Sequence, residues 1–315
     1  MIAVVLRRLG GLVATLLLAS VLIFAVLEIL PGDPARVMLG PNATADAVDA
    51  LREQLGLNAP LMDRYVAWVG GMLTGDMGRS LTYGTGVGAL LLERATVSLP
   101  LAVVALLLTV SIALPVGLLA ASRRGGRTDT TIMALAQLGI AVPNFWFAIL
   151  LVYVFAVSLR WVPSGGFPGW DDPAGAVRTL VLPAVALAVP QAAILARVTR
   201  SALVEVLEAD FVRTARAKGA SRRHVLWAHA LRNALMPVVT ITGLQFAFLL
   251  SGVVIIEQVF SLPGLGRLAV QAITQADLPV VRGVVVTLVA VVVITNFVVD
   301  LLYAVIDPRL RLAAR

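Results

Sequence analysis

The chain has 315 residues, of which 59% are hydrophobic and only 14% are charged, and its mean hydropathy is +0.94. A soluble domain carries roughly 25% charged residues, so this composition excludes an ordinary soluble protein. The chain contains no cysteine, which excludes disulfides, thiol nucleophiles and cysteine metal sites.

Six long uncharged blocks follow one another along the chain. A helix that spans a bilayer needs about 20 apolar residues, within a range of roughly 17–25, and each block meets that length. Because lipid offers backbone groups no hydrogen-bond partner, each block is predicted to be a helix. We therefore expect an all-α polytopic membrane protein with six transmembrane helices. The expected spans cover about residues 1–30, 95–122, 130–157, 179–197, 233–256 and 283–304.

The first block follows Arg7 and Arg8, an arrangement that is also found in cleavable signal peptides. Its apolar core is longer than that of a signal peptide, and no small-residue cleavage pattern follows Glu28. We therefore predict that residues 1–30 are retained as the first transmembrane helix.

Residues 31–94 form a long segment between the first two spans, and their apolar side chains recur at helical spacing. Gly56 is predicted to end the first of two helices. We expect two short amphipathic helices at the outer membrane surface, with Trp68 at the interface. A small soluble subdomain that contacts a partner is the alternative. The apolar positions are Val48, Leu51 and Leu55, followed by Tyr65, Trp68, Val69 and Met72.

Prolines lie inside the third and fourth predicted spans. The third span carries the sequence AVPNFW at residues 141–146, and the fourth contains Pro183 and Pro190. Proline removes a backbone hydrogen bond that a neighbouring helix or water must replace. The expected kinks suit helices that bend or line a cavity, although a purely structural kink is an equally good interpretation for any one proline.

The basic residues predict the orientation of the chain. Six spans place both termini on one side, and if that side is the cytoplasm, sixteen of the 25 Lys and Arg residues face it. This asymmetry follows the positive-inside rule, so both termini are predicted to be cytoplasmic. It also explains the net charge of +7 without a nucleic-acid partner.

The most polar passage, DFVRTARAKGASRRHVLWAHALRNALMP at residues 210–237, follows the fourth span and runs into the start of the fifth. Gly219 fits the C′ position that ends a helix, because cationic side chains precede it in the last turn. Ser221 can cap a second helix. We therefore predict two helices around a glycine bend within a cytoplasmic loop over residues 198–232. Composition alone leaves open whether this loop rests on anionic lipid or docks onto a cytosolic protein.

The two histidines of the chain, His224 and His229, lie in the same passage. No carboxylate pattern accompanies them, so they do not predict a metal site, and we expect them on a solvated or interfacial face.

This passage resembles the cytoplasmic loop of ABC-importer membrane subunits. The general E-A-A-x-x-x-G pattern is matched only in part, but DFVRTARAKGAS and HALRNALMPVV are very similar to the variant typical of dipeptide and oligopeptide permeases. Other stretches resemble that family in the same order, including LEILPGDPA, GDMGRSL, VPNFWFAILLVYVFA, VVIIEQVFSLPGLGRL and DLLYAVIDPRLR. The resemblance is to the B-type membrane subunit, with an ABC transporter type-1 transmembrane domain at residues 95–304 and a cytoplasmic tail at 305–315.

The resemblance implies a complex in a bacterial-type cell membrane. Its other members would be a second, usually different, membrane permease subunit, two cytosolic ATP-binding subunits and an extracytoplasmic solute-binding protein. The chain lacks a G-x-x-x-x-G-K-[ST] phosphate loop, so we expect ATP and Mg²⁺ to bind the partner subunits, and this chain to hold no cofactor and to be no enzyme by itself. The resemblance assigns contact with the ATPase to Asp210, Phe211, Arg213, Thr214, Ala215, Arg216, Ala217, Lys218 and Gly219.

Polar side chains inside the spans are candidates for the transport pathway, because such groups usually face a cavity or the protein interior. A hydrogen bond between helices is the alternative role for each. The loop from Phe260 through Pro263 and Gly264 resembles a family loop that dips towards the cavity, and Asp300 is expected to pair with an arginine. The polar candidates are Gln137, Asn144, Gln245, Ser251 and Asn296.

Two other functions compete with an ABC importer subunit. A secondary transporter or channel is the first, but the spans hold no paired carboxylates. An intramembrane enzyme is the second, but the chain has no HExxH or G-x-S-x-G motif and no aspartate pair in its predicted helices. The sequence leaves the cargo open: dipeptides, longer peptides, nickel chelates, glutathione and haem all fit the family.

Overall fold

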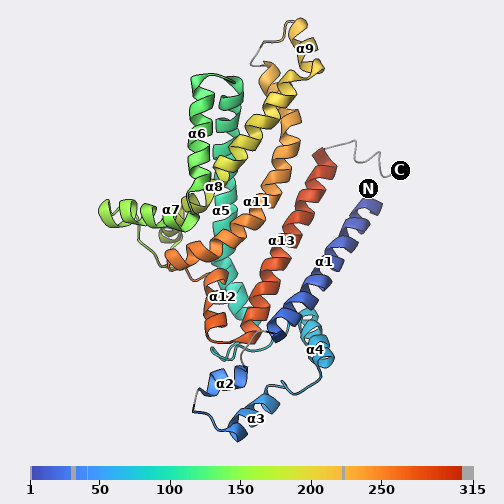
Figure 1. Ribbon diagram of the computed structural model, residues 1–315, viewed down its shortest axis with the longest axis vertical. Helices are drawn as coiled ribbons and strands as arrows, with labels where there is room; N and C mark the ends of the chain where they lie inside the picture. Colours follow the sequence, from blue (N-terminus) through green and yellow to red (C-terminus); the bar gives the residue numbers. More distant parts are fainter. Residues whose placement is uncertain (1, 30–32, 41, 222–223, 307–315) are drawn as a thin grey trace. The chain divides into compact units, whose positions relative to one another are not determined.

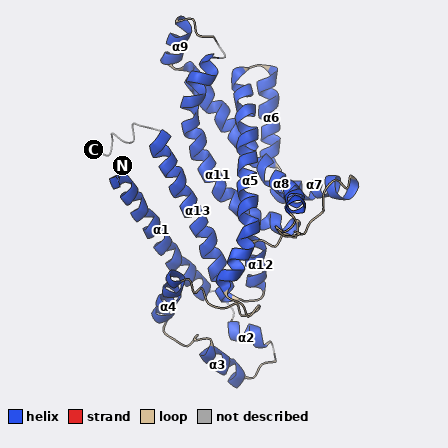
Figure 2. Cartoon of the chain, turned by 180° about the vertical axis from the view of Figure 1, so that it is seen from behind, coloured by secondary structure: helices blue, strands red, loops and turns tan. Residues whose placement is uncertain are grey.

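The computed structural model describes residues 2–29, 33–40, 42–221 and 224–306, and this part of the chain is almost entirely helical (Figures 1 and 2). Its one isolated β-bridge joins Arg79 and Gly86, and the described residues contain no β-strand. The predicted tail beyond residue 306, together with Arg222 and Arg223 of the polar loop, lies outside the described residues.

Five helices are long and apolar enough to cross a bilayer. The sixth candidate is a bent pair, α6 (Arg127–Ala141) with α7 (Asn144–Leu151), whose second member continues as the π-helix η1 (Val152–Ser158). The predicted count of six spans is therefore met when the bent pair is taken as one span. The five unbroken helices are α1 (Ile2–Ile29), α5 (Val87–Ser122), α8 (Pro173–Glu208), α11 (Leu231–Val259) and α13 (Leu278–Ile306).

The prediction of one continuous helix over residues 130–157 is wrong. Val142 and Pro143 both have extended backbone angles, and the two helices meet at 98°. The cause is local, because proline disfavours the helical conformation of the residue before it. The other prolines inside spans, including Pro183 and Pro190 of α8, leave their helices continuous.

Helix α8 extends beyond both ends of its predicted span at 179–197. Asp172 caps its start by accepting a hydrogen bond from the backbone N–H of Gly175, at 3.0 Å, and Pro173 occupies the first helical turn. At its other end the helix continues through Arg197 and Arg200 to Glu208. Charged residues end an uncharged block without ending a helix, so residues 198–208 of the predicted loop belong to α8.

The chain divides into two compact units. Among the described residues, the first comprises 99–262 and 295–306, and its centre is α8, which packs against α6, α7 and α11. Helix α5 also comes close to α8 at a glycine: a Cβ on Gly117 of α5 would lie 2.7 Å from the backbone oxygen of Ala196.

The second unit comprises residues 2–98 and 263–294, and it contains the short helices of the segment between the first two spans. Two short helices, α3 (Ala45–Gln54) and α4 (Leu61–Thr74), lie where the apolar spacing predicts them, and Gly56, with φ +66°, follows the end of α3. Trp68 is half-buried and packs against Phe24 of α1. Its place at a membrane surface stays a prediction. The other short helices are α2 (Pro34–Leu39) and α12 (Leu265–Thr274).

A buried carboxylate fixes the loop before α5 within this unit. Asp277 is fully buried and accepts hydrogen bonds from the Ser80 hydroxyl at 2.5 Å and from the backbone N–H of Thr82 at 3.1 Å. The apolar core beside it contains Val87, Leu91, Leu265, Leu268 and Val281.

Candidate functional site

The candidate site is α9 (Asp210–Ala217), which follows α8 after a single break (Figure 1). Ala209 has φ −67° and ψ 149°, so its extended backbone separates the two helices. Val212 is fully buried, and α9 contacts both α8 and the π-helix η2 (Val225–Ala230). One apolar residue therefore anchors α9 while most of its surface stays exposed.

The bend after α9 is built on Gly219, as the sequence predicts. Gly219 has φ +87°, its N–H donates to the Arg216 carbonyl at 2.9 Å, and the N–H of Ala220 donates to the Ala215 carbonyl at 3.1 Å. These two bonds form a Schellman motif, which satisfies carbonyls that the helix end would leave without partners. Only glycine adopts this φ without strain, so the residue type sets where the helix stops.

The second predicted helix is also confirmed. Ser221 caps it, because its hydroxyl accepts a hydrogen bond from the N–H of His224 at 3.3 Å. The helix runs as the π-helix η2 and then continues directly into α11. The side chain of His229 lies outside the described residues. Among the residues that are described, no group of three or more His, Cys, Asp or Glu could hold a metal ion.

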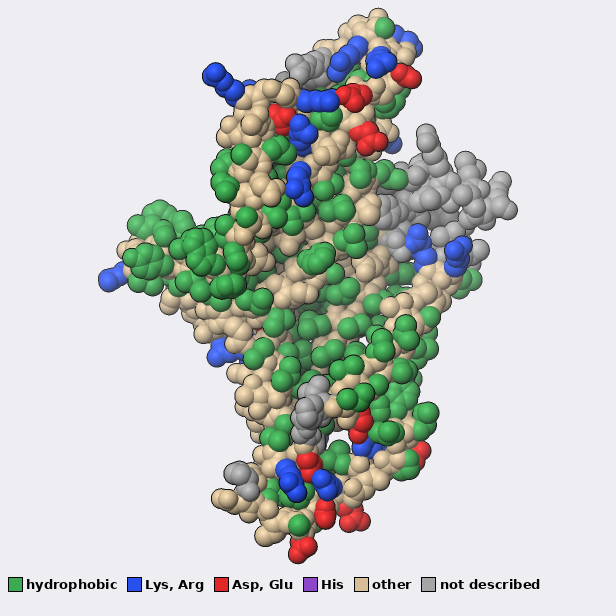
Figure 3. Space-filling model, viewed as in Figure 1, with side chains coloured by type: hydrophobic (Ala, Val, Ile, Leu, Met, Phe, Trp, Pro, Cys, Tyr) green, Lys and Arg blue, Asp and Glu red, His purple; other side chains and the backbone are tan. Residues whose placement is uncertain are grey.

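The exposed surface of α9 combines an aromatic ring with positive charge. Phe211 is 46% exposed. Arg213, Arg216 and Lys218 are exposed around it, and Asp210 forms only a 3.5 Å, fully solvated pair with Arg213. Figure 3 shows Lys and Arg side chains gathered over α9 and the neighbouring helix ends. An exposed ring beside cations suits a protein surface that offers an apolar pocket with carboxylates near it.

A nearly buried ion pair fixes the end of α8 that carries α9. Arg200 donates to both carboxylate oxygens of Asp129 on α6, at 2.8 and 2.7 Å, and the side chain of Asp129 is only 6% exposed. The N–H of Gly125 also donates to this carboxylate, at 3.0 Å. An exposed pair, Arg124 with Glu208, joins the turn between α5 and α6 to the last residue of α8. The end of α8 is thus tied to the hairpin of α5 and α6.

Sequence reasoning missed the pair of Asp129 and Arg200. Its two members stand 71 positions apart, and each looks like an ordinary charge at the edge of an uncharged block. The one available signal was that Asp129 is a lone acidic residue at the start of a span, which invites a search for a basic partner.

The predicted pathway residues make contacts with different partners. Gln245 is buried and its amide donates to the Gln191 carbonyl at 2.9 Å, which is the alternative role, a hydrogen bond between helices. Gln137 accepts from Arg197 at 3.3 Å, and Ser251 donates to Ala247 on its own helix. A pathway role for these residues stays a prediction.

The remaining candidates lie in varied surroundings. Asn144 is half-buried at the start of α7, and Asn296 is exposed on α13. Phe260 is buried, and its carbonyl accepts from the N–H of Gly166 at 2.9 Å. In the other unit, Pro263 is half-buried and Gly264 is buried immediately before α12. The side chain of Asp300, which is predicted to pair with an arginine, lies outside the described residues.

Comparison with known proteins places the chain among transport proteins. The family model described as "Binding-protein-dependent transport system inner membrane component" matches residues 113–312, and the model of its N-terminal part matches residues 1–89. A putative peptide transport system permease protein of Brucella abortus is 43% identical over 312 residues, which are 99% of both chains. The glutathione transport system permease protein GsiC of Escherichia coli is 39% identical over 311 residues, again 99% of both chains.

Solved structures show the same fold. An inward-facing conformation of the MetNI methionine ABC transporter matches 69% of this chain and 96% of that chain, with a TM-score of 0.57 and 22% sequence identity. At that identity the likeness concerns the fold alone.

Proposed function

Because the chain belongs to the family of binding-protein-dependent transport system inner membrane components, and is therefore a permease subunit of an ABC importer, we propose that it carries di- or oligopeptides or related small solutes. The chain is a multi-pass protein of the bacterial plasma membrane. Support for a peptide-like cargo comes from relatives that are named as peptide and glutathione permeases and match along their whole length. The chain forms half of the pathway, and a second, homologous membrane subunit forms the other half.

The observation that carries the proposed mechanism is the exposed, anchored helix α9. It presents Phe211 and three cations outward, while the buried Val212 and the Gly219 bend hold it against α8 and η2. Such a helix can dock into a cytosolic ATPase subunit, which binds the ATP and Mg²⁺. When two ATPases close on ATP, each carries its docked helix with it and shifts the membrane subunit between two conformations.

The two ion pairs at the end of α8, Arg200 with Asp129 and Arg124 with Glu208, transmit this motion to further helices. A push on α9 reaches α8 directly through its single-residue break, and the Asp129–Arg200 pair passes it to α6. This arrangement requires α9 and both termini to face the cytoplasm, as the distribution of basic residues predicts. The segment between α1 and α5 then faces the extracytoplasmic solute-binding protein.

Reconstitution of the complete complex tests this function. Vesicles that contain both membrane subunits, the ATPases and the binding protein should take up a labelled peptide only when ATP is present on the side of the ATPases. Uptake that persists without the ATPases, driven by an ion gradient, would instead identify a secondary transporter. Purification of the complex from native membranes should recover two ATPase subunits with this chain and its membrane partner.

A further inference from the structure

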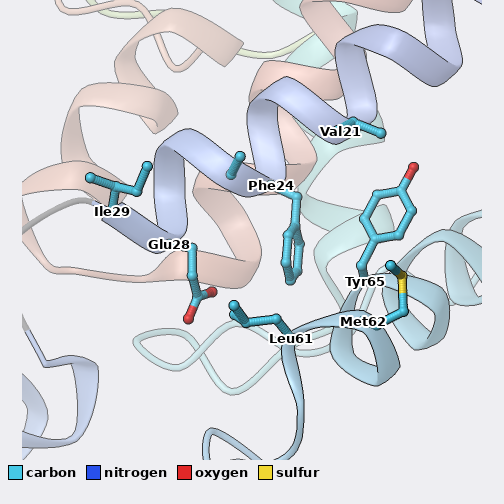
Figure 4. Close-up of a pocket in the computed structure, with 8 residues that line it drawn as sticks. Val21, Phe24, Glu28, Ile29, Leu61, Met62 and Tyr65 are labelled. Atoms are coloured by element: carbon cyan, nitrogen blue, oxygen red, sulfur yellow. The ribbon is translucent and has the colours of Figure 1, made fainter.

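An elongated apolar groove lies between α1 and α4, within the second unit (Figure 4). It encloses about 370 Å³, which is within the range of roughly 300–1,000 Å³ seen in ligand pockets. One wall is a single face of α1 that extends from residue 21 to residue 29, or about 12 Å along the helix. That wall consists of Val21, Phe24, Ala25, Glu28 and Ile29, and α4 contributes Leu61, Met62 and Tyr65.

The groove offers almost no hydrogen bonding along its length. Glu28 is its one charged lining residue and stands at the end of α1. The hydroxyl of Tyr65 is already paired with the Ser20 hydroxyl at 2.9 Å. A peptide backbone in this groove would lose its hydrogen bonds to water and gain few in return, at a cost in free energy for every such group. The walls therefore suit a hydrocarbon chain.

Two arginines that are not themselves part of the groove lining lie against Glu28, with 14% and 15% of their side chains exposed. Its carboxylate pairs with Arg64 of α4 and lies 3.6 Å from Arg282 of α13. Two guanidinium groups against one carboxylate leave a net charge of one positive unit. The guanidinium of Arg282 also lies 4.9 Å from the ring centre of Phe24, and its Nε is buried with no hydrogen-bond partner among the residues that the structure describes. The charged end is thus suited to an anion.

We propose that this groove binds one phospholipid, with an acyl chain along α1 and the phosphate beside Arg64 and Arg282. The apolar run of α1 ends at Glu28, so this end of the groove lies where a spanning helix meets the headgroup layer. The rim residues Ile29 and Met62 are 80% and 68% exposed, so the remainder of the lipid stays in contact with the bilayer. A net positive charge near the headgroups favours an anionic lipid by roughly 1 kcal/mol per basic residue, which corresponds to about a fivefold preference.

Photocrosslinking in the complete complex tests the proposal. The complex is reconstituted with phosphatidylglycerol that carries a diazirine in its acyl chain, and the adducts are mapped by mass spectrometry. Adducts on Ala25, Leu61 and Met62 should saturate and be displaced by unlabelled phosphatidylglycerol about fivefold more effectively than by phosphatidylcholine. Adducts on Val26, which is exposed on α1 outside the groove, should not saturate, because they report lipid that surrounds the protein without a site.

Two pairs of variants separate the parts of the site. Ala25→Phe fills the groove and should abolish the saturable adducts on α4, whereas Val26→Phe should leave them unchanged. Arg64→Gln removes the excess positive charge and should abolish the preference for phosphatidylglycerol, whereas Arg36→Gln, at an exposed position of α2, should not.

Three results would overturn the proposal. Adducts in the groove that never saturate would mean ordinary surrounding lipid. Groove residues that stay unlabelled in the assembled complex would mean that another protein subunit covers them. Displacement of the lipid by a transported peptide would make the groove part of the cargo pathway. None of these results bears on whether uptake needs the ATPases, so the proposed function is tested separately.

Discussion

The bend at Gly219 gives the sharpest test of the docking helix. Replacement by alanine adds a Cβ that meets no atom within 4 Å, so the cost is the conformational strain alone. An L-residue in the left-handed region at φ +87° costs about 1–2 kcal/mol, equivalent to a factor of roughly 5–30 in the population of the bent conformation. Asparagine tolerates this region better and should cost less. Proline cannot adopt it and also removes the N–H that donates to Arg216.

Peptide uptake, normalised to the amount of assembled complex, should therefore fall in the order Gly, Asn, Ala, Pro. Gly219→Pro and Gly219→Glu should abolish uptake while the chain still inserts into the membrane. Gly56 provides a matched control, because it ends α3 with φ +66° and the same two hydrogen bonds, with nothing within 4 Å of its Cβ position. If Gly56→Ala lowers uptake as much as Gly219→Ala, or if Gly219→Pro transports normally, the reasoning fails.

Three further predictions concern packing and contacts. Asp129→Ala leaves Arg200 without its carboxylate and should lower the stability of the complex by roughly 1.5–3 kcal/mol, measured as a lower melting temperature. Glu208→Ala removes an exposed carboxylate and should change the melting temperature little. Gly117→Ala forces a Cβ against the backbone of α8 and should destabilise the complex by about 1–3 kcal/mol, whereas Gly11→Ala, which meets nothing within 4 Å, should not lower the melting temperature. Phe211→Ala should weaken retention of the ATPase in a pull-down by about tenfold or more, and unchanged retention would remove Phe211 from the interface.

The features that local sequence determines were the ones that could be predicted. Uncharged blocks of spanning length locate the membrane helices, because a block in lipid must form its backbone hydrogen bonds within itself. Gly219 and Gly56 marked helix ends correctly, since a Schellman motif depends on one residue that can adopt positive φ. Ser221 marked the next helix start for a similarly local reason.

The features that depend on tertiary contacts could not be predicted. Pro143 signals the break in the third span, but the 98° angle between α6 and α7 also depends on how each of them packs against α8. The pair of Asp129 and Arg200 joins separate helices, and the sequence around either residue does not identify its partner. The groove between α1 and α4 was missed because its lining resembles any apolar helix surface in the sequence.

Site-specific crosslinking addresses the central claim, contact between α9 and an ATPase, most directly. The chain has no cysteine, so Ala217→Cys at the exposed end of α9 provides a unique thiol on this subunit, and Ala59→Cys between α3 and α4 provides the control. With a short thiol crosslinker and cysteines on the ATPase surface, position 217 should join the ATPase with and without ATP, and position 59 should not. Failure of position 217 to crosslink in every nucleotide state of an intact complex would contradict the account.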